Sequence, residues 1–299
     1  MSTMSPVQQA PAPQRTAGGP HERERRRAGR GAGILTHLIL IGFCLFSLVP
    51  FVNVLLISVA PQGQLAVGIR WPSDIDFGNF PRAWDAANFS VLMLNSAIVT
   101  LFVVAIGTLV SLLAGYALGT MRFPGRGMVF VLFLIGLLMP FEATIVPLYY
   151  DLREVGLANT YAGLILPEAA LFLSFGAFWM RAHFLATERA LLEAARIDGA
   201  NTWTILWRVL VPNARGPITT MMVLFFIWSW NEFLLALVLA QDPAVQTVPA
   251  GLGLFIGQYT TDYSGLSAAA IIMTVPALLV FVVLQRHFIR GVTSGGVKG

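Results

Sequence analysis

Charged residues are scarce in this chain. Asp, Glu, Lys and Arg make up 11% of its 299 residues, against roughly 25% in a typical soluble domain, while apolar residues make up 56%. Three long runs contain none of the four charged types: 31–69, 86–121 and 263–285. Each run is long enough to cross the roughly 30 Å hydrocarbon core of a bilayer, which takes about 20 helical residues. The composition excludes a large soluble core and predicts an all-α, polytopic membrane protein.

Lysine is scarcer still, because Lys298, at the end of the sequence, is the only one. A P-loop follows the pattern G-x4-G-K-S/T, and its lysine reaches the phosphates of the nucleotide. The sequence therefore contains no ATP site of this kind. The pair of glycines at 251 and 253 does not match a dinucleotide-binding pattern either, and we interpret it as a flexible stretch of loop.

Cysteine and histidine supply no reactive or metal-binding site. Cys44 stands alone inside the first apolar run, which excludes a disulfide or a C-x-x-C site. The four histidines are scattered without the spacing of metal ligands: His21, His37, His183 and His287. No G-x-S-x-G elbow occurs. We expect no catalytic residues, no metal and no cofactor, so the sequence indicates a protein that is not an enzyme.

Hydropathy predicts six membrane spans, at about 34–60, 90–118, 127–150, 160–181, 217–240 and 266–285. Of the 19 Lys and Arg, only Arg70, Arg82 and Arg153 fall in segments that would be external if both termini were cytoplasmic. Basic residues collect in cytoplasmic segments of membrane proteins. The sequence therefore predicts a multi-pass protein of the cell (inner or plasma) membrane with both termini in the cytoplasm.

The expected organisation has four parts. Residues 1–32 read as a disordered, Arg-rich cytoplasmic tail, whose basic run orients the first helix near anionic lipid and does not bind nucleic acid. Residues 33–89 contain the first transmembrane helix and an external segment that is partly ordered. Residues 90–286 form the main transmembrane domain, and 287–299 form a short cytoplasmic tail.

One cytoplasmic loop, 182–216, is long and polar. Its first part, 187–198, predicts a helix with Thr187 as N-cap, and Gly199 would end this helix because glycine tolerates positive φ. Ala194 and Ala195 are small and would let another surface approach closely. The loop could instead rest among lipid headgroups. An Ala-rich helix with two acidic residues is a poor ligand for anionic lipid, so a protein partner is favoured.

The second part of the loop predicts another short helix, 202–210, with Asn201 as its N-cap. Pro212 would stop this helix, and Pro217 would open the fifth span. The loop is therefore expected to form a helix–turn–helix at the cytoplasmic face of the membrane.

The motifs of this loop resemble those of a known family. Glu193-Ala194-Ala195-x3-Gly199, followed by Val211-Pro212, resembles the EAA motif of ABC-importer permeases. Further motifs occur in the order found in the second, MalG-like permease subunit of carbohydrate importers: Asn95-Ser96, Ala114-Gly115-Tyr116-Ala117, Arg122-Phe123-Pro124-Gly125-Arg126, Trp228-Ser229-Trp230-Asn231-Glu232-Phe233, Arg290-Gly291 and Val297-Lys298-Gly299. The resemblance covers about residues 34–299. One departure is that the second proline, expected four residues after Pro212, is at Pro217, with Gly216 in its place.

The resemblance implies a type I ABC importer fold and an ATPase that is a separate polypeptide. It implies that the ATPase-coupling residues are Glu193, Ala194, Ala195, Asp198, Gly199 and Pro212, and that the C-terminal residues 291–299 approach the ATPase. The implied partners are a second permease subunit in a heterodimer, a dimer of cytoplasmic ATP-binding subunits, an extracytoplasmic solute-binding protein, a sugar and membrane lipid.

Three acidic residues, Glu142, Glu168 and Glu232, fall within the outer halves of neighbouring expected spans. A charge inside the membrane needs a partner or water, so we expect a hydrated cavity that opens toward the outer face. Glu142 and Glu168 could instead reach interfacial water. The candidate substrate-pathway residues are Glu232, Asn231, Trp230, Trp228 and Glu142.

These residue types suit a saccharide, because indole rings stack on sugar rings while Asn and Glu bond hydroxyl groups. The tryptophans could instead be interface anchors. Away from their ends, the expected spans contain no Arg or Lys, which favours a neutral mono- or oligosaccharide. An ion-coupled secondary transporter is the alternative, and the charged loop and the lack of a visible repeat disfavour it.

Overall fold

The computed structural model describes residues 20–63, 68–257 and 259–296, with side chains for 35–63, 68–257 and 259–285. The chain divides into two units, Met1–Asn53 and Val54–Gly299. The expected disordered tail lies outside the described residues as far as residue 19. The described remainder of that expected tail, residues 20–32, is helical and forms the start of helix α1 (Pro20–Ser58). The last helix, α13 (Tyr263–Gly296), likewise continues into the expected C-terminal tail.

Four described helical stretches are long and apolar enough to cross a membrane: Leu35–Ser58 of α1, α3 (Phe89–Thr120), α6 (Tyr161–Ala186) and Tyr263–Gln285 of α13. Two bent helix pairs raise the number to six if each pair counts as one span. The prediction of a polytopic all-α protein is confirmed, while two of the six spans differ from the continuous helices that were expected.

The expected third span, 127–150, is broken. Helix α4 (Arg126–Leu138) is followed by a 3-10 turn, η1 (Phe141–Thr144), and by α5 (Ile145–Glu154), with a bend of 92°. Met139 is extended, with ψ of 131°. Residues that precede a proline avoid the helical region, so Pro140 explains the break.

The expected fifth span, 217–240, is also broken. Helix α10 (Arg215–Trp230) ends at Asn231, and α11 (Leu234–Leu239) follows. The Asn231 side chain donates to the carbonyl of Ile227, and Glu232 Oε1 accepts from the Leu235 amide at 2.9 Å. Side chains that bond nearby backbone groups compete with helical hydrogen bonds, which explains why this helix does not continue.

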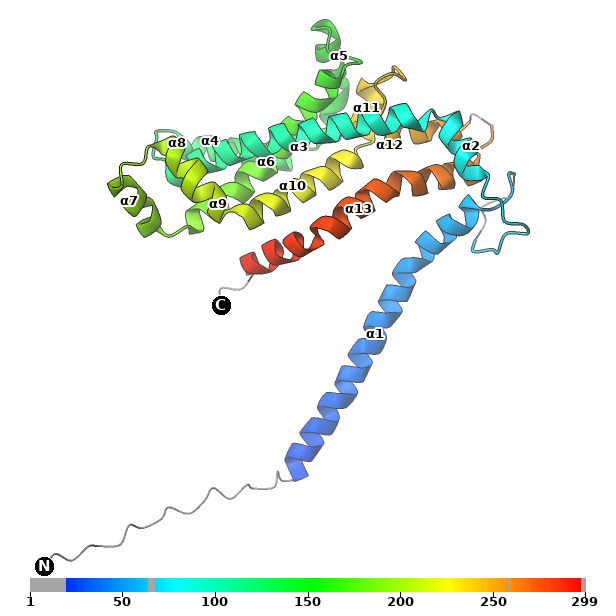
Figure 1. The fold of residues 1–299 in the computed structure, drawn as a ribbon, viewed down its shortest axis with the longest axis horizontal. Coiled ribbons are helices and arrows are strands. Elements are labelled where there is room, and N and C mark those ends of the chain that lie inside the picture. Colours follow the sequence, from blue (N-terminus) through cyan, green and yellow to red (C-terminus); the bar gives the residue numbers. More distant parts are fainter. Residues whose placement is uncertain (1–19, 64–67, 258, 297–299) are drawn as a thin grey trace, which may run out of the picture. The chain divides into compact units, whose positions relative to one another are not determined.

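Helices α3 and α6 pack at unusually close range. A Cβ atom on Gly115 of α3 would lie 2.5 Å from Cβ of Met180 on α6, so only glycine fits there. On the α6 side, Gly176 faces Ser111 of α3 in the same way. In membranes, where lipid is as apolar as the helices, small residues let two backbones approach and gain van der Waals contact. Helix α10 packs on both α3 and α6, and α13 packs on α10, as Figure 1 shows.

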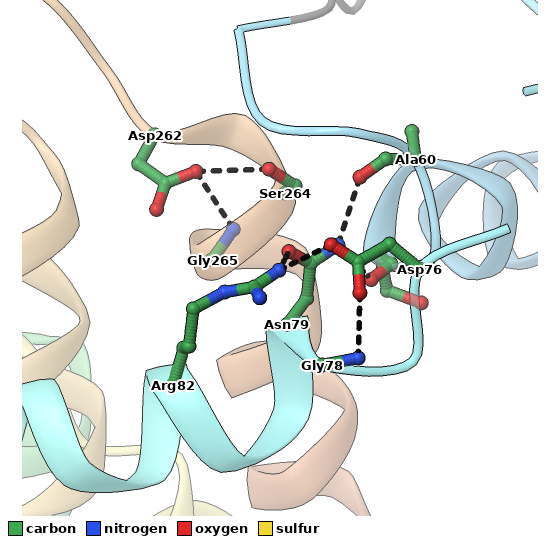
Figure 2. A network of polar contacts seen from close by, with 9 residues as sticks. Ala60, Asp76, Gly78, Asn79, Arg82, Asp262, Ser264 and Gly265 are labelled. Atoms are coloured by element: carbon green, nitrogen blue, oxygen red, sulfur yellow. Dashed lines mark hydrogen bonds and ion pairs between the residues drawn. The ribbon is translucent and has the colours of Figure 1, made fainter. Parts of the chain in front are cut away.

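The segment that the sequence predicts to be external contains helix α2 (Asn79–Ala86). The buried Asn79 side chain donates to the carbonyls of Ser58 and Ala60, which ties α2 to the end of α1 (Figure 2). Arg82 Nη2 lies 2.5 Å from Asp76 Oδ2. The hydrogen bond from Arg82 is the largest cause that holds the pKa of Asp76 below its usual value.

The end of the bundle away from the polar loop is held by a buried asparagine. The amide of Asn95, on α3, donates to the carbonyls of Ala244 and Gln246, and its oxygen accepts from the Tyr161 hydroxyl at 2.7 Å. These bonds join α3, α6 and the loop after α11. The motif Asn95-Ser96 is therefore structurally placed at a junction of three segments.

Candidate functional site

The polar loop forms a helical hairpin at one end of the bundle (Figure 1). Its first helix, α7, spans Arg189–Ile197, and its N-cap is Glu188, which makes no capping hydrogen bond. The expectation that Thr187 is the N-cap is wrong, because its hydroxyl donates to the carbonyl of His183 in α6. Gly199 ends the helix with φ of +80°, as predicted.

The second half of the hairpin is longer than expected. Asn201 caps it as predicted, its side-chain oxygen accepting from the Thr204 amide at 2.8 Å. The helix runs through α8 (Thr202–Thr204), a π-helical segment (Ile205–Leu210) and α9 (Val211–Asn213). The expectation that Pro212 stops the helix is wrong, since the wide π-helical turn before it relieves the clash that a proline ring makes in an α-helix. The chain then bends by 80° into α10, where Pro217 lies in the first turn.

The six predicted coupling residues do not share one environment. Ala195 is 9% exposed and belongs to the hydrophobic core. The other five are exposed on the hairpin: Glu193, Ala194, Asp198, Gly199 and Pro212. Ile197 is 86% exposed beside them, although the sequence did not single it out.

The hairpin is anchored in the transmembrane bundle. Leu206 and Leu210 are fully buried in one core cluster with Met180 and Phe184 of α6. The hydroxyl of Tyr116, on α3, donates to the carbonyl of Thr202 at 3.1 Å. A force applied to the exposed face of the hairpin would therefore act on α3 and α6 directly.

The two candidate pathway tryptophans point to different helices. Trp230 is buried, its ring stacks on Phe226, and its indole nitrogen donates to the carbonyl of Met273 on α13 at 3.0 Å. Trp228 is exposed on one side and packs edge-on against Phe172 and Phe175 of α6. The structure does not bring the two indole rings together, and Trp230 joins helices.

The three acidic residues also lie in different settings. Glu142 is exposed on η1, and Glu232 is half-buried where its carboxylate accepts from the Leu235 amide in the first turn of α11. Glu168 is only 2% exposed, and its Oε1 has no hydrogen-bond partner among the described residues. It lies near Ser229, whose hydroxyl donates to Thr100 of α3. Glu168, Ser229 and Thr100 form a buried polar cluster between α3, α6 and α10, and Glu232 lies close enough to Glu168 for its charge to act on it. The hydrated cavity expected from the sequence stays a prediction.

Sequence reasoning missed a cavity of about 720 Å³ beside the hairpin. It lies between the end of α3, the start of α4, the end of α6 and α7, and its lining includes Arg122, Arg126, Arg189, Arg196 and Glu193. The signal in the sequence was the pair of arginines around Pro124-Gly125, opposite the pair on α7.

Comparison with known proteins agrees with this architecture. The sequence profile of the family described as "Binding-protein-dependent transport system inner membrane component" matches residues 107–294. The chain is 33% identical to the diacetylchitobiose uptake system permease protein of Streptomyces coelicolor, covering 91% of each chain. It is 33% identical to an arabinooligosaccharides transport system permease protein of Halalkalibacterium halodurans, covering 89% of this chain and 98% of that one.

The fold is also similar to a solved structure. A chain of a bacterial ABC transporter involved in the import of the acidic polysaccharide alginate superposes with a TM-score of 0.74 and 25% identity, over 88% of this chain and 98% of that chain. The likeness covers most of the chain, well beyond any single motif.

Proposed function

The chain belongs to the family of binding-protein-dependent transport system inner membrane components. On this basis we propose that its hairpin is the docking site of a separate ATPase, whose conformational change drives transport. The family makes the chain a multi-pass membrane component of an ABC importer that has no ATPase site of its own. The observation that carries the proposal is that the exposed face of the hairpin is rigidly joined to α3 and α6 through buried Leu206 and the bond from Tyr116 to Thr202.

In this proposal, Glu193, Ala194, Asp198, Gly199 and Pro212 contact the ATPase, and Ile197 adds apolar area. Ala195 takes part by holding α7 on the core. ATP binding would draw two ATPase subunits together and move the docked hairpins, and each hairpin would swing its bundle between an inward-facing and an outward-facing state as a rigid body.

The proposed partners are a second permease subunit, a dimer of ATP-binding subunits and an extracytoplasmic binding protein that delivers the substrate. The proposed substrate is a neutral mono- or oligosaccharide, supported by the names of the relatives from Streptomyces coelicolor and Halalkalibacterium halodurans. Trp228, Asn231, Glu232 and Glu142 remain proposed pathway residues, since each presents exposed or half-exposed surface. Trp230 supports them by fixing α10 on α13.

The test uses the assembled transporter in proteoliposomes with its binding protein and the sugar. In the variant Glu193→Ala, docking should weaken by about tenfold, the loss typical of one important interface residue, and sugar uptake should fall with it. Glu188→Ala is the matched control, because Glu188 is exposed on the same hairpin but lies outside the proposed contact. ATP hydrolysis and uptake are measured side by side.

ATPase docking and sugar uptake at the wild-type level in Glu193→Ala would remove Glu193 and the exposed face of the hairpin from the coupling path. Uptake that continues without the ATPase, driven by an ion gradient, would instead support a secondary transporter. No observation on this chain favours that alternative.

A further inference from the structure

The cavity beside the hairpin is rich in positive charge. Four arginines line it, Arg122, Arg126, Arg189 and Arg196, against one acidic residue, Glu193. In the part of the chain that the structure describes, none of these arginines forms an ion pair within 4.0 Å, whereas Arg82 pairs with Asp76 at the other end of the bundle. Arg126 donates to the carbonyls of Met121 and Gly119, while Arg122, Arg189 and Arg196 are exposed toward the cavity and its rim.

Two further groups add to this positive field. Arg181 of α6 lies close enough to Arg126 for the two charges to act on each other, and its buried Nε has no hydrogen-bond partner among the described residues. Its guanidinium rests 3.8 Å from the centre of the Phe130 ring. Helix α4 also starts at the cavity, with Gly125 as its N-cap and no side-chain cap, while the Arg126 amide donates to the carbonyl of Phe123. Free amides at a helix N-terminus favour an anion. The cavity therefore has four arginines against one carboxylate and carries an excess of positive charge.

The apolar surroundings indicate which anion fits. Outside the cavity, α4 presents an exposed stripe at helical spacing: Met128, Val131, Leu132 and Ile135. None of the residues of α4 is buried. The helix has 13 residues and is about 20 Å long, enough to line one leaflet of a bilayer whose core is roughly 30 Å thick.

We propose that this cavity binds the phosphate headgroup of an anionic phospholipid, with an acyl chain lying along the exposed stripe of α4. Arg122 of the loop between α3 and α4, Arg126 of α4 and the two arginines of α7 would hold the phosphate, and the lipid would join the hairpin to the membrane surface. This changes the interpretation of α7, which the sequence alone made a poor ligand for lipid. Arg189 and Arg196 of α7 would bind the phosphate together with Arg122 and Arg126, which precede α6 in the chain.

The test uses the purified full-length chain, stripped of lipid and offered equal amounts of phosphatidylglycerol and phosphatidylcholine. Native mass spectrometry then counts the lipids retained. Wild type should retain phosphatidylglycerol in preference. The double variant Arg122→Gln/Arg189→Gln should lose affinity by about 30-fold, the effect expected of two basic residues near an anionic lipid surface. Among the residues that the structure describes, neither side chain makes a hydrogen bond or ion pair that the fold would lose.

The matched control is Arg153→Gln/Arg215→Gln, which removes the same charge from two exposed arginines outside the cavity. It should retain the lipid as wild type does. Equal retention of the two lipids by wild type would overturn the proposal, with no variant needed. So would full retention by the cavity double variant, or displacement of the lipid by excess inorganic phosphate alone. Because no ATPase is present, the result is independent of the coupling role of the hairpin.

Discussion

At the scale of single residues, two adjacent alanines have opposite surroundings. Ala194 is exposed beside Glu193, while Ala195 is packed in the core with Met180 and Leu206. The two alanines are adjacent in the motif. Successive residues of an α-helix point about 100° apart around its axis, so only one of the two faces a partner. The two positions therefore separate docking from folding.

We expect Ala194→Leu to leave the thermal unfolding midpoint of the purified chain unchanged and to weaken ATPase docking, since added bulk on an exposed surface obstructs only a partner. Ala195→Leu should instead cost about 1–3 kcal/mol of stability, because extra methylene groups overpack a filled core. Unfolding in detergent and co-purification with the ATPase measure the two effects. Equal effects of the two variants on stability would contradict the assigned faces.

At the scale of helices, α3 and α6 pack closely against each other along a seam, and the hairpin would transmit its movement to this pair of helices. The two helices meet at Gly115 and Gly176, and the hairpin core at Leu206 and Leu210 packs at the end of the same pair. Close packing resists sliding, so α3 and α6 would move together. The two broken spans would not move as single rigid helices, because the turns at Pro140 and Glu232 interrupt their backbones.

Gly115→Ala should destabilise the seam by about 1–3 kcal/mol, the usual cost of overpacking. The new Cβ would lie 2.5 Å from Met180 Cβ and 2.9 Å from the Arg181 amide nitrogen. The control is Gly127→Ala in α4, where nothing lies within 4 Å of the new atom and helix propensity improves by up to about 1 kcal/mol. Thermal unfolding is the measurement, and a seam variant as stable as the control would show that the helices do not meet so closely.

At the scale of the whole molecule, the described bundle has two distinct ends. The hairpin α7–α9 and the end of α13 lie at one end, and α2 and α12 (Val248–Gly251) lie at the other, as Figure 1 shows. The distribution of arginines predicts that the hairpin end is cytoplasmic. The ATPase and the binding protein would then act on opposite ends of one bundle.

Cysteine labelling in spheroplasts tests this orientation. In a Cys44→Ala background, which removes the single native cysteine, Tyr259→Cys should react with a membrane-impermeant maleimide. Ile197→Cys should react only after the membrane is permeabilised. Both positions are highly exposed, at 90% and 86%, so access to the reagent and not burial decides the outcome. The reverse pattern would place the hairpin outside the cell and exclude contact with a cytoplasmic ATPase.

The sequence by itself determined the features that depend on neighbouring residues. Long charge-free runs specify membrane helices, Asn201 caps the second hairpin helix with its own side chain, and Gly199 supplies the positive φ that ends the first. Only the tertiary structure decided which side chains are covered and which meet. In the folded chain Ala195 and Glu168 are buried, Trp228 packs on α6 and Trp230 bonds to α13. Local hydrogen bonds and dihedral angles are set within a few residues, whereas burial depends on helices that are distant in the chain.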